Sequence, residues 1–230
     1  MRGWVGVFGL IVMLVTTHTQ AQLQPFSATY SASLDLLIDI PVEAVRKLER
    51  IDETSWRFTS IARAAIARQE ERSDLSYSSD AWVPSYYQYQ RSVFGRVREI
   101  SVNFQPERNR IMTVARNEPW SQAYEEGVQD KLSYQLQLRE DLLAGKSMLS
   151  YRIADGGRIK TYRFTRAGNE RLTTPAGTFD CIRLQLERTA DQQQTLIWMA
   201  PELEYLTVRL LRIDESGREH FLNLKSLETN

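Results

Sequence analysis

Residues 26–36 read FSATYSASLDL, and in this stretch apolar and polar residues alternate at every step. A period of two places all the apolar side chains on one face of an extended strand, whereas a helix would scatter them around its circumference. The alternation recurs at residues 100–104, 182–186 and 205–210, and residues 195–199 form a short β-prone run. These patterns predict a protein built mainly from half-buried β-strands.

Turn signals separate the strand patterns. They are Gln105-Pro106, Asp155-Gly156-Gly157, Ala167-Gly168-Asn169, Thr174-Pro175-Ala176-Gly177 and Asp214-Glu215-Ser216-Gly217. In the second half of the chain these signals recur about every ten residues or somewhat more, a spacing typical of an antiparallel meander. No linker rich in Gly, Ser or Pro and no clear repeat divides the chain. We therefore expect one β domain over residues 22–230.

Residues 130–145 depart from the strand pattern. Leucines and a tyrosine alternate there as in a strand, yet Leu132, Leu136 and Leu143 also fall on one helical stripe. Asp130 is a good N-cap and Gly145 suits the position after a helix. We predict a helix of about three turns that packs on the sheet. The expected fold is thus a curved antiparallel meander sheet, or half-open barrel, with one helix packed across it.

The first twenty-one residues carry the pattern of a secretory signal peptide. Arg2 precedes an apolar run over residues 3–15, and Thr19-Gln20-Ala21 is a small-x-small cleavage pattern. The run is too short and too weakly flanked for a membrane-spanning helix. No cysteine follows it, so we expect an exported chain without a lipid anchor. After cleavage at residue 21 we expect no transmembrane segment.

The charge balance excludes two classes of partner. Lys and Arg together number 29, as do Asp and Glu, and cleavage would remove only Arg2. A nearly neutral protein lacks the basic footprint of a general nucleic-acid binder. It also lacks the charge needed to attach to anionic lipid by electrostatics alone.

Residues suited to catalysis are scarce. Cleavage would leave His220 as the single histidine and Cys181 as the single cysteine, and no Gly-x-Ser-x-Gly motif occurs. A tetrahedral zinc site is therefore not expected, nor is a calcium loop. Two adjacent carboxylate pairs, Glu70-Glu71 and Glu125-Glu126, would point to opposite faces of a strand. We expect no cofactor and no enzymatic activity.

The second half carries an ordered set of motifs: Asp130-Lys131-Leu132-Ser133, Thr174-Pro175-Ala176-Gly177-Thr178-Phe179 and Leu196-Ile197-Trp198-Met199-Ala200-Pro201-Glu202. Their order resembles that of a bacterial envelope family known as domain of unknown function 3108. The chain departs from the family at Pro41-Val42-Glu43 and Leu206-Thr207. The resemblance implies an export-dependent, periplasmic β domain, and it brings no established catalytic residues. At the level of fold alone, the pattern also resembles the half-barrels that carry lipoproteins across the periplasm.

Aromatic residues are the candidates for ligand binding. Trp82, Tyr86, Tyr87 and Tyr89 surround Pro84, and Trp198 lies in a later strand. Such residues can line a pocket for an acyl chain or a sugar, and they are also ordinary cross-strand pairs.

Three functions follow from these features. The first is a non-catalytic binding or assembly factor of the cell envelope, which would hold a lipid or acyl chain in a concave sheet that the helix leaves partly open. The alternative is a structural module that docks on another envelope protein. The third is an enzyme that acts on envelope polysaccharide.

Overall fold

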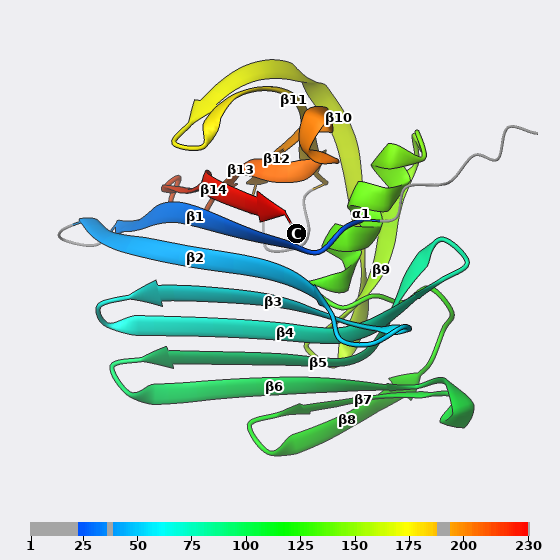
Figure 1. Cartoon of the computed structure of the whole chain (residues 1–230). Coiled ribbons are helices and arrows are strands. Elements are labelled where there is room, and N and C mark those ends of the chain that lie inside the picture. Colours follow the sequence, from blue (N-terminus) through cyan, green and yellow to red (C-terminus); the bar gives the residue numbers. More distant parts are fainter. Residues whose placement is uncertain (1–22, 36–38, 188–193, 230) are drawn as a thin grey trace, which may run out of the picture.

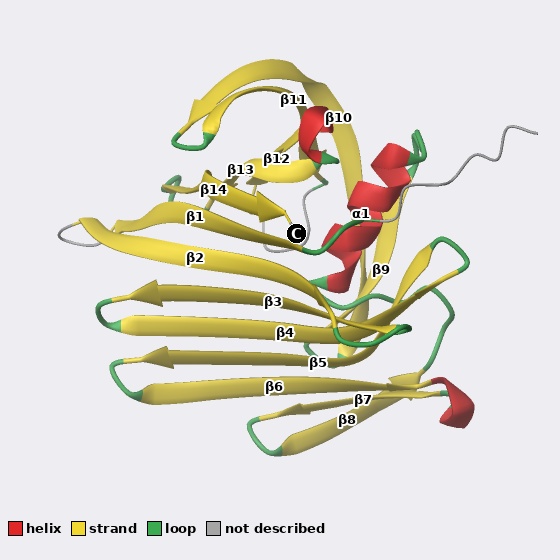
Figure 2. Ribbon diagram, in the orientation of Figure 1, coloured by secondary structure: helices red, strands yellow, loops and turns green. Residues whose placement is uncertain are grey.

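The computed structural model describes residues 23–35, 39–187 and 194–229, and within them fourteen strands form one antiparallel sheet (Figures 1 and 2). The predicted signal peptide and Leu36 of the opening run lie outside the described residues. The strands are β1 Phe26–Asp35, β2 Asp39–Arg50, β3 Ser55–Ala64, β4 Ala67–Ser78, β5 Ala81–Val93, β6 Arg96–Gln105, β7 Arg110–Ala115, β8 Glu118–Ala123, β9 Leu149–Asp155, β10 Arg158–Thr174, β11 Gly177–Leu186, β12 Gln194–Ala200, β13 Leu206–Ile213 and β14 Glu219–Thr229.

The order of the strands confirms the predicted meander. The sheet runs from β8 back to β1, continues through the β1–β14 pair, and then runs from β14 back to β9. Strands β8 and β9 are therefore the two ends of the sheet, and the sheet is not closed into a barrel. The strong curvature in Figure 1 brings the two halves around a shared interior.

The opening alternation has the expected effect on burial. Phe26, Ala28 and Tyr30 of β1 are buried, while Ser27 and Thr29 between them are partly exposed. One turn signal was wrong: Ala167-Gly168-Asn169 lies inside β10, where the register with β11 shifts at Gly168. Gly168 has a φ of 115°, so the glycine accommodates a bulge in a long strand instead of ending it.

The predicted helix is present as α1 Ser133–Leu143. Asp130 precedes it and accepts hydrogen bonds from the Leu132 and Ser133 N–H groups at 2.7 and 2.8 Å. This contact satisfies backbone donors that a helix start leaves without partners. Leu132 and Leu136 of the predicted stripe are buried, but the prediction was wrong for Leu143, which is 38% exposed at the end of the helix. Figure 2 shows the helix lying within the curve of the sheet, as the sequence predicts.

Polar contacts fix α1 to both halves of the sheet. Gln137 accepts a hydrogen bond from the Trp82 N–H of β5 at 2.9 Å and donates one to Asp141 at 2.9 Å. Tyr151 of β9 donates to the other oxygen of Asp141 at 2.9 Å. Because these groups are buried, losing one partner would leave another polar group unsatisfied. The helix therefore joins the two halves in a defined position.

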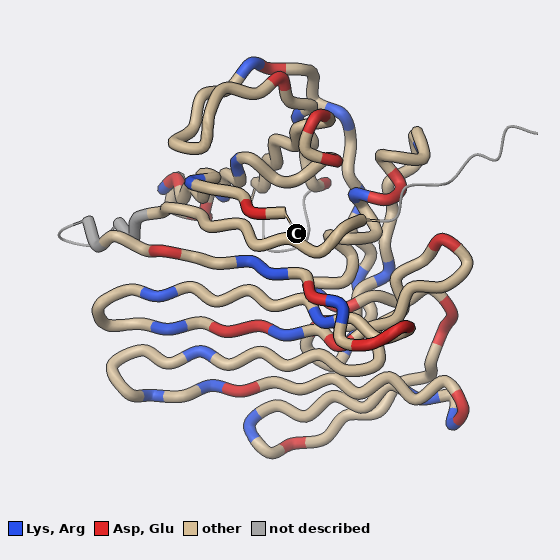
Figure 3. Tube along the Cα trace, viewed as in Figure 1, with Lys and Arg blue, Asp and Glu red and all other residues tan. Residues whose placement is uncertain are grey.

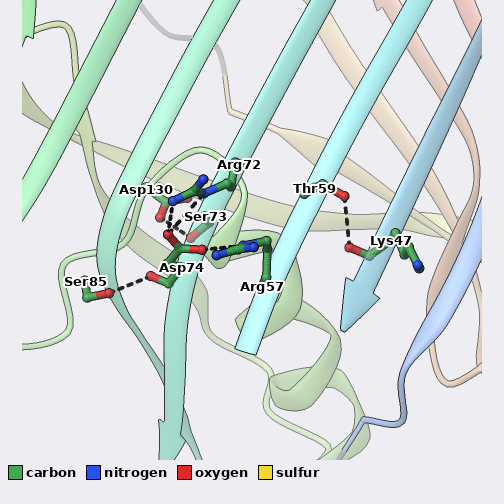
Figure 4. Close-up of polar contacts among 8 residues, drawn as sticks. All are labelled: Lys47, Arg57, Thr59, Arg72, Ser73, Asp74, Ser85 and Asp130. Atoms are coloured by element: carbon green, nitrogen blue, oxygen red, sulfur yellow. Dashed lines mark hydrogen bonds and ion pairs between the residues drawn. The ribbon is translucent and has the colours of Figure 1, made fainter. Parts of the chain in front are cut away.

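Neighbouring residues of β4 show how the strands separate interior from exterior. Figure 4 shows Ser73 beside Asp130, with a hydroxyl-to-carboxylate hydrogen bond of 2.6 Å, while Asp74 points the other way. Asp74 bonds to Arg57 at 2.7 Å and Arg72 at 2.5 Å on the outer face. The alternation thus sends one residue toward α1 and the next into a partly exposed ion-pair network.

Among the described residues, no helix is both long enough and apolar enough to cross a membrane.

Candidate functional site: a cavity inside the curved sheet

A cavity of about 420 Å³ lies inside the curved sheet. Residues from β4, β5 and β6 line one side, and residues from β9 to β13 line the other. The beginning of α1 contributes Tyr134 and Gln135, and Lys131 just precedes it. The helix therefore fills part of the interior and leaves a cavity of the size typical of small-molecule sites.

A polar part of the cavity lining, which we call the floor, consists of Glu71, Tyr87, Lys131 and Asp155. Tyr87 donates a hydrogen bond to Glu71 at 2.7 Å, and Gln69 donates to the other carboxylate oxygen at 2.9 Å. Burial, together with the charge and hydrogen bond of Glu71, raises the pKa of Tyr87 above its ordinary value. Tyr87 therefore remains a neutral hydrogen-bond donor.

Asp155 forms ion pairs with two lysines. Lys131 and Lys160 lie 2.6 and 2.8 Å from its carboxylate oxygens. Burial opposes ionisation of Asp155, but the hydrogen bonds and charges of the lysines outweigh it and hold the pKa below its usual range. Asp155 is therefore a charged, paired carboxylate at the floor.

Tyr134 of α1 faces charged groups from several strands. Burial raises the pKa of its hydroxyl to about 12; the charges of Arg46 and Arg212 lower this pKa, while that of Glu71 raises it. The three charged groups come from β2, β4 and β13, and two of them, Glu71 and Arg212, line the cavity together with Tyr134. The start of α1 is therefore where the two halves of the sheet meet inside the cavity.

Trp120 contacts the opposite edge of the open sheet. It lies on β8, and a Cβ added to Gly157 in the β9–β10 turn would be 3.3 Å from its Cγ. Its side chain remains 42% exposed. Because β8 and β9 are the two ends of the sheet, this contact spans the opening between them, next to the cavity-lining Gly156.

The aromatic candidates from the sequence lie in different places. Tyr87 and Tyr89 line the cavity. Trp82 is fully buried and packs edge-on against Trp56 with ring centroids 5.4 Å apart. Tyr86 lies beneath the Arg72 guanidinium at 5.7 Å, and Trp198 is buried and donates its indole N–H to Glu170 at 2.8 Å. The structure brings only Tyr87 and Tyr89 to the cavity.

Several cavity residues were missed by the sequence reasoning. They are Arg91, Arg98, Lys131, Tyr134 and Arg212. The period of two in β5 offered a signal for one of them, because Tyr87, Tyr89 and Arg91 share one strand face.

Most of the side chains suited to catalysis are paired or buried. His220 lies 3.3 Å from Asp214 at the β13–β14 turn. Cys181 is buried, and burial raises the pKa of its thiol to about 11. Glu70 pairs with Arg68 and Glu125 with Arg152. In the described ranges, no three side chains of His, Cys, Asp or Glu gather into a set that could hold a metal ion.

Seven solved chains are similar to this chain, three of which follow, and a comparison with curated proteins found no match. A β-barrel-like protein of domain of unknown function DUF1849 from Brucella abortus matches with a TM-score of 0.60 and 10% identity, over 91% of this chain and 99% of that one. This likeness shows a shared fold.

Two weaker matches cover 92% of this chain and 87% of theirs. One is a Vibrio parahaemolyticus domain whose name refers to outer membrane lipoprotein sorting, with a TM-score of 0.29 and 10% identity. The other is a DUF1329 family protein from Desulfovibrio piger, with a TM-score of 0.27 and 9% identity. These scores are too low to support an argument.

The motifs of the second half predicted a family, and the family comparison confirms it. Residues 27–220 match the family described as a protein of unknown function, DUF3108. The match covers all strands from β1 to β13, together with α1. The chain therefore belongs to the DUF3108 family.

Proposed function

We propose that the chain is an exported, non-catalytic binding or assembly factor of the cell envelope that holds the apolar part of a ligand, such as a lipid or acyl chain, in the cavity. The observation that carries the proposal is the cavity of about 420 Å³ that α1 leaves open. Tyr87, Tyr89 and Ile100 line it on one side and Leu210 on the other. These side chains supply apolar and aromatic surface for a chain-like ligand.

The proposed location rests on the amino-terminal sequence. Residues 1–21 have the pattern of a signal peptide, and the mature chain over residues 22–230 would be a single domain in the periplasm without a lipid anchor. Fractionation of cells that produce the full chain, with mass determination of the mature protein, tests this proposal. A product that begins at residue 22 and leaves with the periplasmic fraction supports it, whereas an uncleaved cytoplasmic product contradicts it.

Blocking the cavity tests ligand binding. Purified protein is stripped of lipid and titrated with a neutral fluorescent acyl probe. Leu210→Trp adds a large side chain to the cavity lining, and we expect it to weaken probe binding by at least about tenfold. Val97→Trp adds the same ring at an exposed position and serves as the control. Equal probe affinity in both variants, or no binding by the unmodified protein, would overturn the proposal.

Docking on another envelope protein ranks second. Strand β8 is at one end of the sheet, where an edge could pair with a partner strand. However, β8 is short and contains Pro119, which has no N–H to donate. Both features commonly protect the edge of a sheet from pairing with another strand. Crosslinking in cells separates the two functions, because a docking module gives one dominant partner.

A further inference from the structure

The cavity wall formed by β5 and β6 changes from apolar to basic along the strands. The register pairs Tyr87 with Val102, Tyr89 with Ile100 and Arg91 with Arg98. All six side chains line the cavity. From Tyr87 to Arg91 is four residues, or about 14 Å along a strand. An apolar section of the wall is therefore followed by a pair of guanidinium groups toward the β5–β6 turn.

The opposite wall changes in the same way. Here Leu210 lines the cavity, and the next row of paired residues, Leu186, Thr195 and Arg212, also lines it and ends in a guanidinium group. The β5–β6 and β13–β14 turns lie at the same end of the molecule, on the left in Figure 1. Figure 3 shows Lys and Arg positions gathered near that end of β3 to β6. We call this end, with Arg91, Arg98 and Arg212, the basic mouth.

The charges of the basic mouth are not balanced within the cavity lining. Among the described residues, the guanidinium groups of Arg91, Arg98 and Arg212 form no ion pair or hydrogen bond. Lys131 and Lys160 already bind Asp155, so Glu71 is the carboxylate that remains, and its oxygens accept hydrogen bonds from Tyr87 and Gln69. Like charges directly opposite each other destabilise a strand pair, as Arg91 and Arg98 do here. An anion between them would remove this repulsion.

We propose that the cavity binds an anionic amphiphile, with its acyl chain along the two apolar walls and its carboxylate or phosphate head group between Arg91, Arg98 and Arg212. This inference rests on the proposed function, because it assigns the ligand class of the same cavity. Guanidinium groups suit both head groups, since their paired N–H donors match carboxylate and phosphate oxygens. The ligand would thus be oriented, with its tail beside Ile100, Val102 and Leu210.

Competition against the neutral fluorescent probe tests the proposal. Dodecanoate, dodecyl phosphate and dodecanol are compared, all below the concentrations at which they aggregate. We expect both anions to compete at least about tenfold better than dodecanol. In the double variant Arg91→Gln/Arg98→Gln this preference should fall below about threefold, because the head group loses two cationic partners. Added salt should weaken the binding of the two anions and leave the binding of dodecanol unchanged.

A matched control separates the mouth from general surface charge. Arg96→Gln/Arg116→Gln removes the same charge from two exposed positions, at the start of β6 and in the β7–β8 turn, that do not line the cavity, and it should keep the preference. Equal competition by dodecanol and dodecanoate would overturn the head-group assignment while leaving the proposed function intact. Failure of all three ligands and the probe would overturn the proposed function itself. Competition by inorganic phosphate as strong as by dodecyl phosphate would show a free-anion site and overturn the amphiphile.

Discussion

Asp130 places a carboxylate fully out of solvent at the start of α1. Burial raises its pKa to about 6, although the hydrogen bonds from Ser73, Leu132 and Ser133 oppose the shift. In an unfolded chain the pKa of an aspartate is near 3.9. Between these values the folded protein keeps a proton that the unfolded chain releases. The free energy of unfolding that Asp130 contributes is therefore largest in acid and falls as the pH rises toward neutrality.

Asp130→Asn isolates this effect, because an amide occupies the same space and does not titrate in this range. From about pH 4 to about pH 7, the free energy of unfolding of the variant should rise by about 2 kcal/mol relative to that of the unmodified protein. Denaturant titrations of both proteins at the two pH values measure the difference between their free energies of unfolding. The contributions of the other titrating groups are the same in both proteins and therefore cancel. Asp80→Asn, at an exposed turn, is the control. A difference independent of pH would contradict the assignment.

At the scale of elements, the contact between Trp120 and Gly157 connects the two ends of the sheet. Gly157 and Gly95 occupy turns with nearly the same φ, 75° and 76°. Because alanine is strained at such angles, it should lower the free energy of unfolding by about 1 kcal/mol at either position. Only at Gly157 would the new methyl group also meet Trp120, whereas nothing lies near Gly95. Gly95 therefore serves as a matched reference for the strain alone.

When Trp120 is present, we expect Gly157→Ala to lower the free energy of unfolding by about 0.5–1 kcal/mol more than Gly95→Ala does. When Trp120→Ala is also introduced, the two glycine substitutions should lower it equally. Denaturant unfolding of the four combinations at each glycine measures this coupling energy. A difference that persists without Trp120 would show that the ring does not lie on the β9–β10 turn.

The sequence predicts the individual elements better than it predicts the cavity that they enclose. The alternation in β1 and the capped leucine stripe of α1 are local patterns, so strands and helix could be predicted from neighbouring residues. The β4–β5 and β7–β8 turns use Ser79-Asp80 and Arg116-Asn117, all with positive φ, and neither has the glycine that marks such turns. Which side chains share the cavity depends on the β1–β14 pairing and the curvature, which no local pattern encodes. Arg212 could not be placed near Arg91 from their positions in the chain.

At the scale of the whole molecule, the sheet has two halves that share the β1–β14 pair and α1. The cavity takes residues from both halves, so a bound ligand would contact β5 and β13 at once. A ligand that binds only the folded state raises the free energy of unfolding, by about 2.7 kcal/mol at one hundred times its dissociation constant. Binding in this cavity should therefore stabilise the entire sheet.

Thermal unfolding with dodecanoate tests this expectation. For a chain of this size the midpoint should rise by about 5–10 °C at that saturation, and it should keep rising with ligand concentration. At the same concentration the rise should be smaller in Arg91→Gln/Arg98→Gln and at most about half as large in Leu210→Trp, whereas Val97→Trp should respond like the unmodified protein. An equal rise in Leu210→Trp would place the stabilising ligand elsewhere on the surface. The pattern across these variants therefore distinguishes ligand held between the two halves from ligand adsorbed outside them.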